Sequence, residues 1–258
     1  KLDQPSEKEE SSKTSSVKHH MIRAEGKGFD AIAGMNAVKD ILFQDVILPL
    51  REKELYEQYK ISIPNGMLFY GPPGCGKTLG AQALAGEIGI PMLYVRFDAL
   101  ISSYLGETAS NIGKIFEYAK KDSWVIFFDE FDAIGRSRND STEHGEIKRV
   151  VNAFLQQIDN YHGRSLIIAA TNFEQSLDYA IWRRFDETIR FDMPSNEEKI
   201  KLFTMKMKRF NGPGHVLEQY INELQAFSHS DVEKICQIIK FLVFLPMISL
   251  PFRRFRVK

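Results

Sequence analysis

The feature that most constrains the fold is the eight-residue segment Gly71 to Thr78, which reads GPPGCGKT. It follows a short apolar run, Met67 to Tyr70, and leads into a segment of good helix formers, Leu79 to Ile88. A strand, a glycine-rich turn and a helix, in this order, form the setting that a phosphate-binding loop requires. Glycines let consecutive backbone N–H groups point at phosphate oxygens, and the helix N-terminus adds partial positive charge there. The segment therefore predicts binding of a nucleoside triphosphate, and an accidental turn before a helix is the alternative it argues against.

The residues of this loop have separate predicted roles. The ammonium group of Lys77 is expected to reach the β- and γ-phosphates, and the hydroxyl of Thr78 is expected to ligate Mg²⁺. Mg²⁺ is therefore a predicted cofactor. The remaining contacts to the nucleotide are expected from the loop and the first helical turn, namely from Pro73, Gly74, Cys75, Gly76 and Leu79.

A second motif combines an apolar run with two acids. Trp124 to Phe128 are five consecutive apolar residues, and Asp129 and Glu130 follow directly. Such a run predicts a buried parallel strand, and ligands in open α/β sheets bind at the carboxyl ends of the strands. We expect Asp129 to hold Mg²⁺, directly or through water, and Glu130 to orient and activate the attacking water. An ordinary strand ending in surface acids is the alternative, and the phosphate loop upstream argues against it.

Two further polar positions are ambiguous when read by themselves. A buried strand, Ser165 to Ala170, is followed by Asn172, whose side chain would be placed to touch the γ-phosphate or the attacking water, although by itself it is more typical of a turn. Arg183 and Arg184 lie between two aromatic residues, where a solvated basic turn is the simpler interpretation.

Length and charge limit the classes of function. The 258 residues are enough for one large domain and a smaller one. The formal net charge is zero, which argues against nucleic acid or an anionic membrane as a partner. Two cysteines form no disulfide framework and indicate a reducing, cytoplasmic compartment. Because the chain begins with Lys and no signal-like segment follows, we expect it to be part of a longer protein.

The apolar patterning predicts an α/β fold with a parallel sheet, followed by a small helical domain. Residues 1–27 are polar and are expected to be a disordered linker. Residues 28–193 alternate strands and helices and form the nucleotide-binding domain, and residues 194–258 are helical. Within the larger domain, Pro49 is expected to end a helix that begins at Met35.

The end of the chain is unusual. Residues 241–252 are apolar apart from one serine, and Pro246 and Pro251 are expected to break any helix there. The run is too short to span a bilayer. An interfacial anchor, a strand packed on the helical domain and an altered terminus remain open.

Taken together, these motifs resemble the AAA ATPase family of the AAA+ superfamily, over roughly residues 28–240. Gly71 to Thr78 matches the family's Walker A motif and Val125 to Glu130 its Walker B motif. Asn172 matches the sensor 1 residue, and Leu177 to Asp186 matches the second region of homology. The adjacent arginines are more similar to the katanin, spastin and Vps4 group than to members with spaced arginines.

The resemblance implies a P-loop NTPase with an αβα large domain and a helical lid, which hydrolyses ATP with Mg²⁺. Asn172 would be catalytic, and Arg183 and Arg184 would be fingers that reach the γ-phosphate of a neighbouring subunit. The resemblance therefore replaces the interpretation of the two arginines as a solvated surface turn. A well-placed arginine finger contributes about 10³–10⁵ to the rate of phosphoryl transfer. The resemblance also implies a homo-oligomeric ring, usually a hexamer.

Two other assignments rest on the resemblance. Tyr104 and Leu105 fall where the family has its first pore loop, and they would grip an extended polypeptide substrate in the central channel. The family's entry segment, whose backbone lies against adenine, is matched by residues 30–34, which makes Asp30, Ile32 and Gly34 expected nucleotide contacts.

The lid departs from the family pattern at two neighbouring positions. The family's Ser-Gly-Ala-Asp appears here as the four residues Ser228 to Asp231, with His229 and Ser230 in place of the glycine and the alanine. Either His229 contacts the ribose or base, or the lid lies further from the nucleotide.

Three functions compete. The first is ATP-driven remodelling, unfolding or disassembly of a protein threaded through a ring. The second is a DNA-associated AAA+ ATPase of the clamp-loader or initiator type, against which the neutral charge and the aromatic pore-like loop argue. The third is a nucleotide-gated binding module with little turnover, against which the complete set of catalytic residues argues.

Overall fold

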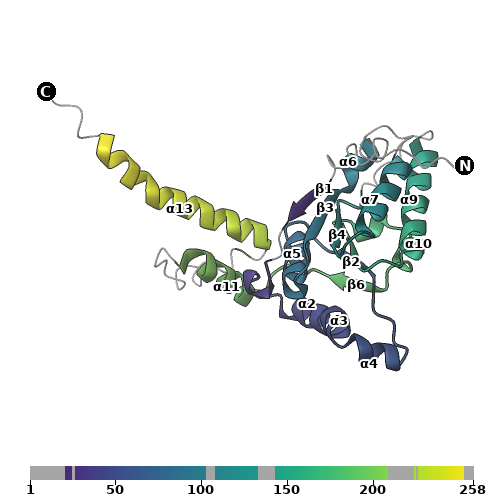
Figure 1. Cartoon of the computed structure of the whole chain (residues 1–258). Helices are drawn as coiled ribbons and strands as arrows, with labels where there is room; N and C mark the ends of the chain where they lie inside the picture. The colour runs from purple at the N-terminus through teal and green to yellow at the C-terminus, as the bar shows by residue number, and fades with distance from the viewer. Residues whose placement is uncertain are drawn as a thin grey trace, which may run out of the picture. The chain divides into compact units, whose positions relative to one another are not determined.

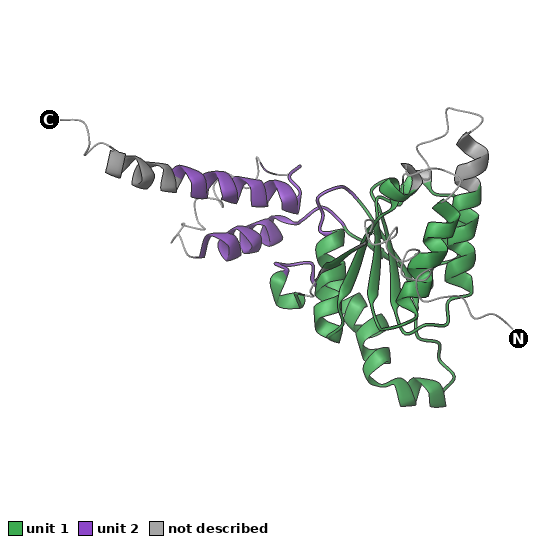
Figure 2. Ribbon diagram, turned by 45° about the horizontal axis from the view of Figure 1, so that its top comes forward, with its two compact units in different colours: residues 1–31, 37–71, 77–191 green, residues 32–36, 72–76, 192–258 purple. Residues whose placement is uncertain are grey.

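The computed structural model describes residues 21–24, 27–102, 108–132, 143–208, 224 and 226–252 (Figure 1). The chain divides into two compact units (Figure 2). Unit 1 consists of residues 1–31, 37–71 and 77–191, and unit 2 of residues 32–36, 72–76 and 192–258. The long segment of unit 1 ends at residue 191, and the domain bounds 28–193 and 194–258 stay predictions. The structure additionally groups two short segments, 32–36 and the interior of the phosphate loop, with the helical unit.

Unit 1 is built on a six-stranded sheet with the strand order β1-β3-β4-β5-β2-β6. Every pairing is parallel except that of β1 with β3, which is antiparallel. The parallel strands confirm the predicted α/β fold. Their bounds are β2 (Gly66–Tyr70), β3 (Met92–Arg96), β4 (Val125–Asp129), β5 (Leu166–Thr171) and β6 (Glu187–Arg190).

Strand β1 (Met21–Ala24) was not predicted, since it lies within the segment expected to be a disordered linker. It pairs with the edge strand β3, with Met21 opposite Val95 and Ala24 opposite Met92. The guanidinium of Arg23 lies 5.4 Å from the ring centroid of Trp124. A short segment, Met-Ile-Arg-Ala, at the end of a polar stretch is therefore ordered by an available sheet edge, which supplies its backbone hydrogen bonds.

Helices cover both faces of the sheet (Figures 1 and 2). Helix α5 (Lys77–Ile88) follows the phosphate loop and contacts strands β3, β4 and β5 on one face. Helices α7 (Thr108–Ala119) and α9 (Glu143–Asp159) pack together on the other face. Other helical segments among the described residues of the unit include η1 (Phe29–Ala31), α6 (Phe97–Ser102), η3 (Glu174–Ser176) and α10 (Tyr179–Trp182).

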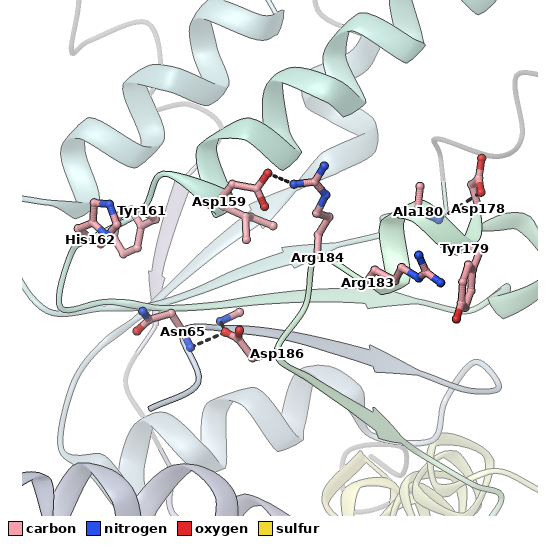
Figure 3. Close-up of a pocket in the computed structure, with 12 residues that line it drawn as sticks. Asn65, Asp159, Tyr161, His162, Asp178, Tyr179, Ala180, Arg183, Arg184 and Asp186 are labelled. Atoms are coloured by element: carbon pink, nitrogen blue, oxygen red, sulfur yellow. Dashed lines mark hydrogen bonds and ion pairs between the residues drawn. The ribbon is translucent and has the colours of Figure 1, made fainter. Parts of the chain in front are cut away.

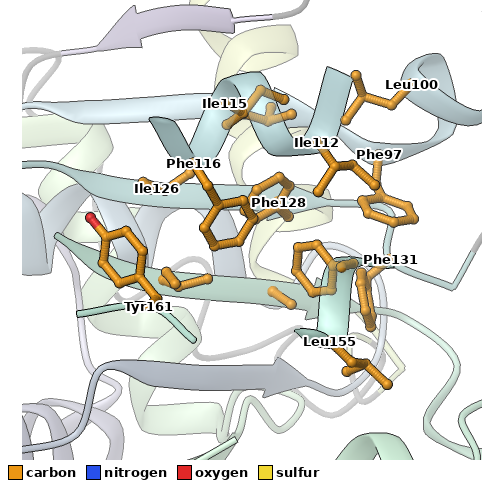
Figure 4. Packing of buried hydrophobic residues seen from close by; sticks show 14 of the residues in the cluster. Phe97, Leu100, Ile112, Ile115, Phe116, Ile126, Phe128, Phe131, Leu155 and Tyr161 are labelled. Atoms are coloured by element: carbon orange, nitrogen blue, oxygen red, sulfur yellow. The ribbon is translucent and has the colours of Figure 1, made fainter. Parts of the chain in front are cut away.

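The core under α7 and α9 is rich in aromatic rings (Figure 4). The rings of Phe116, Phe128 and Phe154 are fully buried and lie 4.9–6.0 Å apart between centroids. Edge-to-face and offset contacts of this kind contribute beyond their buried area. They fix β4, which carries the acids, against the helices behind it.

The helix that begins the unit corrects one prediction. The chain runs through α2 (Asn36–Ile41), the π-helical segment η2 (Leu42–Ile47) and α3 (Leu48–Arg51), so Pro49 does not end the helix. Pro49 lies in the first turn of α3, where its missing N–H needs no partner. Helix α4 (Lys53–Gln58) follows.

Unit 2 contains α11 (Asn196–Met207) and α13 (His229–Phe252). A capping box starts α11, because Ser195 and Glu198 each accept a hydrogen bond from the other's backbone N–H. The two helices bury a small shared core formed by Leu202, Phe203, Met207, Val232 and Cys236. These helices agree with the predicted helical domain.

The expectation that prolines break the last helix was wrong. Helix α13 runs through Pro246 and Pro251 to Phe252. An internal proline costs about 3 kcal/mol, and residues 241–252 offer no glycine at which an end would be more favourable. Within the described parts of the chain, no helix has the length and apolar character needed to cross a membrane.

Candidate functional site

The phosphate-loop segment has the backbone conformation that its glycines predict. Gly71, Gly74 and Gly76 have φ values of 135°, 75° and 92°, in the region that favours glycine. A Cβ atom on Gly71 would lie 2.2 Å from the carbonyl oxygen of Phe191, in the strand-end segment alongside. A side chain at Gly71 would therefore require the backbone to move.

The two functional side chains after the loop are held by contacts within unit 1. Lys77 is buried, with 6% of its surface exposed, and its Nζ donates a hydrogen bond to the carbonyl of Gly71 at 2.7 Å. The ammonium group is thus folded back over the loop. The Thr78 hydroxyl donates to Oδ2 of Asp129 at 3.3 Å. A hydroxyl and a carboxylate oxygen at this separation suit Mg²⁺, which prefers hard oxygen ligands.

The acid pair lies where β4 ends. Asp129 is the last residue of β4, and its Oδ1 accepts the backbone N–H of Glu130 at 2.9 Å. Glu130 has a φ of 55°, which is uncommon for a residue with a side chain. Backbone strain of this kind occurs where the surrounding structure holds a functional residue in place.

The neighbouring strand contributes polar residues that motif reasoning missed. The hydroxyl of Tyr94 donates to Oδ2 of Asp129 at 3.0 Å. Arg96 forms an ion pair with Asp98 at 2.5 Å between Nη2 and Oδ2. Asp98, in α6, lies close enough to Glu130 to affect its ionisation. The sequence contains one signal for this contribution. Tyr94 and Arg96 are polar residues at alternate positions near the end of an otherwise apolar strand, so their side chains share one face of the sheet.

These surroundings change the acidity of Glu130. Burial raises the pKa of Glu130, and the negative charge of Asp98 raises it further. Burial also opposes ionisation of Asp98, but the hydrogen bond from Arg96, a backbone hydrogen bond from Ala99 and the charge of Arg96 together outweigh it and lower the pKa of Asp98. Of these two carboxyl groups, Glu130 therefore binds a proton more readily than Asp98.

Asn172 follows β5, the strand next to β4, and so lies at the same end of the sheet as the acid pair. Its backbone N–H donates to Oδ1 of Asp132 at 3.3 Å, and the Asp132 side chain is fully buried. The predicted grouping of Asn172 with the acids therefore agrees with the sheet order.

Arg183 and Arg184 lie elsewhere, in a pocket of about 870 Å³ (Figure 3). We call it the arginine pocket; it is lined by residues 65–66, 158–159, 161–162, 178–180, 183–184 and 186. Arg184 forms an ion pair with Asp159 at the end of α9. The guanidinium of Arg183 lies 4.3 Å from the ring centroid of Tyr179.

The arginine pocket lies at the amino end of the sheet. Gly66 begins β2, and Asp186 directly precedes β6 and accepts the backbone N–H groups of Asn65 and Gly66 at 2.8 and 2.9 Å. Because β2 and β6 run parallel to β4 and β5, this end is opposite to the one that carries Asp129. Within one chain, the two arginines of the pocket therefore lie at the opposite end of the sheet from Asp129 and Glu130.

Several predicted nucleotide contacts belong to unit 2. Ile32 is buried, and the carboxylate of Glu198 lies against Gly34, where an added Cβ would approach Cγ to 2.6 Å. Glu198 also accepts the N–H of Met35 at 2.5 Å. Asp30, in η1 of unit 1, is exposed.

His229 also belongs to unit 2 and begins α13. Both of its ring nitrogens are buried without a hydrogen-bond partner among the described residues. Burial lowers the pKa of His229, which favours a neutral imidazole. Nearby in the same unit, the N–H of Ser230 donates to the carbonyl of Gly74 at 3.1 Å.

Comparison with known proteins identifies the family. The model of the ATPase family associated with various cellular activities (AAA) matches residues 67–193. This chain belongs to the AAA family. The match covers both motifs of the phosphate site, Asn172 and both arginines.

Individual AAA relatives agree. The chain is 46% identical over 201 residues to an uncharacterized AAA family ATPase, y4kL, of Sinorhizobium fredii, covering 77% of this chain and 60% of that protein. It is 36% identical over 214 residues to the proteasome-activating nucleotidase of Thermococcus onnurineus, covering 80% and 54%. The chain therefore spans about half to three fifths of the length of these relatives.

A crystal structure of the FIGL-1 AAA domain in complex with ADP superimposes with a TM-score of 0.74 at 25% identity, covering 88% of this chain and 77% of that one. The AAA fold is thus shared over most of the chain. The narrower katanin, spastin and Vps4 grouping stays a prediction. Tyr104 and Leu105, the predicted pore residues of the AAA domain, lie outside the described residues.

Proposed function

We propose that this chain is the ATPase of an oligomeric AAA ring that uses Mg²⁺ and ATP to remodel a polypeptide substrate. The observation that carries the proposal is the separation of two sets of side chains in unit 1. Lys77, Thr78, Asp129 and Glu130 gather at the carboxyl end of the sheet, whereas the arginines lie at its amino end.

The carboxyl-end residues have the roles that phosphoryl transfer requires. Lys77 binds the β- and γ-phosphates, and Thr78 and Asp129 hold the cation. When bound, Mg²⁺ supplies positive charge that neutralises the phosphate oxygens. Glu130 orients the attacking water and accepts its proton, and Asn172 positions the water or the γ-phosphate from the next strand.

The arginines act on the nucleotide of a neighbouring subunit. A five-residue strand such as β2 spans about 16 Å, so an arginine at its amino end does not reach a phosphate bound at its carboxyl end. Arg183 and Arg184 are both exposed and available to a second chain. Hydrolysis then depends on assembly, for which a hexameric ring is the proposed state.

The remaining assignments follow the same model. Asp30, Ile32, Gly34 and His229 contact the adenosine part of the nucleotide, and Pro73 to Gly76 and Leu79 complete the phosphate contacts. The two unpaired ring nitrogens of His229 support its role, because a buried imidazole without partners gains from a ligand that supplies them. Tyr104 and Leu105 grip the polypeptide, a substrate class that the proteasome-activating relatives also support.

The test is ATPase activity per subunit as a function of protein concentration, for the wild-type chain and for Arg184→Ala. We expect activity per subunit to rise steeply with concentration and to be lost in the variant. Arg51→Ala, which removes an arginine from α3, is the control and should leave both curves unchanged.

Constant activity per subunit at every concentration, indifferent to Arg184, would contradict the proposal. It would indicate an NTPase complete within one chain. Acceleration by an unfolded polypeptide, but not by DNA, is the expected second result and separates remodelling from a DNA-associated activity.

A further inference from the structure

Tyr94 is the polar residue nearest to the acid pair that belongs to none of the recognised motifs. It lies on β3, which pairs in parallel with β4. In that register Tyr94 is opposite Phe127 and Arg96 is opposite Asp129. Since alternate residues share a face of the sheet, Tyr94 and Asp129 lie on the same face.

The phenol ring is held in place by packing. It stacks on the ring of Phe127, with 5.9 Å between centroids and 26° between planes. Its chain neighbours, Leu93 and Val95, are buried in the core on the opposite face. The sheet register therefore determines where the hydroxyl of Tyr94 lies.

The hydroxyl completes a set of three donors around one carboxylate. Oδ2 of Asp129 accepts from Tyr94 at 3.0 Å and from Thr78 at 3.3 Å, and Oδ1 accepts the N–H of Glu130 at 2.9 Å. These donors come from β3, from α5 and from the residue after β4. Burial, followed by the charge of Asp129, raises the pKa of Tyr94, so the phenol keeps its proton at neutral pH.

We infer that Tyr94 is a positioning residue for the Mg²⁺ site, which acts by holding Asp129 in the orientation that faces Thr78. This inference rests on the proposed function, because it assumes that Asp129 and Thr78 hold the cation. Tyr94 acts through the hydrogen bond that its hydroxyl donates to Asp129. Partners that orient a metal ligand typically change metal affinity by about 10–100-fold when removed.

The experiment measures binding of a fluorescent ADP to the 258-residue chain by anisotropy, across Mg²⁺ concentrations and in EDTA. Tyr94→Phe removes one hydroxyl and keeps the ring on Phe127. We expect the Mg²⁺ concentration for half-maximal enhancement of binding to rise about 10-fold, with affinity in EDTA unchanged. Tyr118→Phe is the matched control, because that tyrosine also packs on an aromatic ring, Trp124, in the same unit.

A double variant tests whether Tyr94 affects the Mg²⁺ site through Asp129. If Tyr94 acts through Asp129, adding Tyr94→Phe to Asp129→Asn changes the Mg²⁺ dependence no further than Asp129→Asn alone. An undiminished effect in that background would overturn the inference.

Two further outcomes would also overturn it: an unchanged Mg²⁺ dependence in Tyr94→Phe, or an equal loss of affinity with Mg²⁺ and with EDTA. Either would leave the proposed function intact, provided that the wild-type chain binds ADP. Failure of the wild-type chain to bind any nucleotide would instead overturn the proposed function together with this inference.

Discussion

The two ends of the sheet in unit 1 differ in how their side chains are held. At the carboxyl end, Asp129 and Glu130 are half-buried and each has named side-chain or backbone partners within the chain. At the amino end, Arg183 and Arg184 are exposed and lie in an open pocket.

Under the proposed function, this difference separates the groups that one chain supplies to its own nucleotide from those that it supplies to a neighbour. Fixed donors and acceptors around the acids form a preorganised site, which catalysis of phosphoryl transfer depends on. An exposed ion pair such as Arg184 with Asp159 is weak, so Arg184 can exchange it for another anion at little cost. In this proposal, the carboxyl end holds its catalytic groups within one chain, and the arginines at the amino end are available to a second chain.

The largest expected effect comes from separating the two ends onto different chains. Arg184→Ala and Glu130→Gln should each reduce turnover severely, by about 10³-fold or more for the arginine. Mixed in equal amounts, the two inactive variants should regain part of the activity, because each supplies the end that the other lacks. The measurement is steady-state ATPase of the mixture against each variant alone.

No recovery on mixing, despite mixed oligomers detected by light scattering or crosslinking, would mean that both ends serve the same chain. A mixture of Glu130→Gln with Glu130→Gln/Arg184→Ala is the control. It has no intact acid pair and should stay inactive.

Glu130→Gln by itself should uncouple binding from hydrolysis. Loss of a general base typically costs about 10²–10⁴ in rate, whereas Gln keeps the shape of the side chain. Nucleotide affinity should therefore be unchanged while turnover falls. Glu117→Gln, an exposed acid on α7, is the control. Normal turnover in Glu130→Gln would show that another group activates the water.

A smaller effect is expected from Asp98→Asn, as a shift in the pH dependence of kcat. Glu130 must be ionised to accept a proton, and burial and Asp98 raise its pKa, so activity should fall as pH decreases through that pKa. Removing the charge of Asp98 lowers the pKa of Glu130, and the acidic limb should move to lower pH. Asp122→Asn, an exposed acid before β4, should leave the profile unchanged. A shift to higher pH would contradict this account of the carboxyl end.

The smallest effect is expected from Asp159→Asn at the other end. An exposed ion pair is worth about 0–1 kcal/mol, so the free energy of unfolding in urea should change by less than that. A loss of several kcal/mol would show that the arginine pocket is as firmly held as the acid pair. The exposed helical pair of Glu117 and Lys120 provides a comparison, through Glu117→Gln.

Much of the fold and of the site could be predicted from local patterns. The phosphate loop, the acids after the apolar run and the alternation of strands and helices are each encoded over a few neighbouring residues. The agreement extends to α5 and to the strands β2, β4 and β5, whose predicted ends differ from the observed ones by two residues or fewer. The prolines were the weak point, because whether a helix tolerates Pro49 or Pro246 depends on what surrounds it.

The sequence by itself determined which chemistry this AAA chain carries, because Lys77, Thr78, Asp129 and Glu130 occur in short motifs whose spacing sets their geometry. Only the tertiary structure decided that Tyr94 and Asp98 join them, that β1 closes the sheet edge, and that the arginines lie at the opposite end. The physical reason is that these relations depend on strand order and cross-strand register. Both are set by packing between segments that are far apart in the chain.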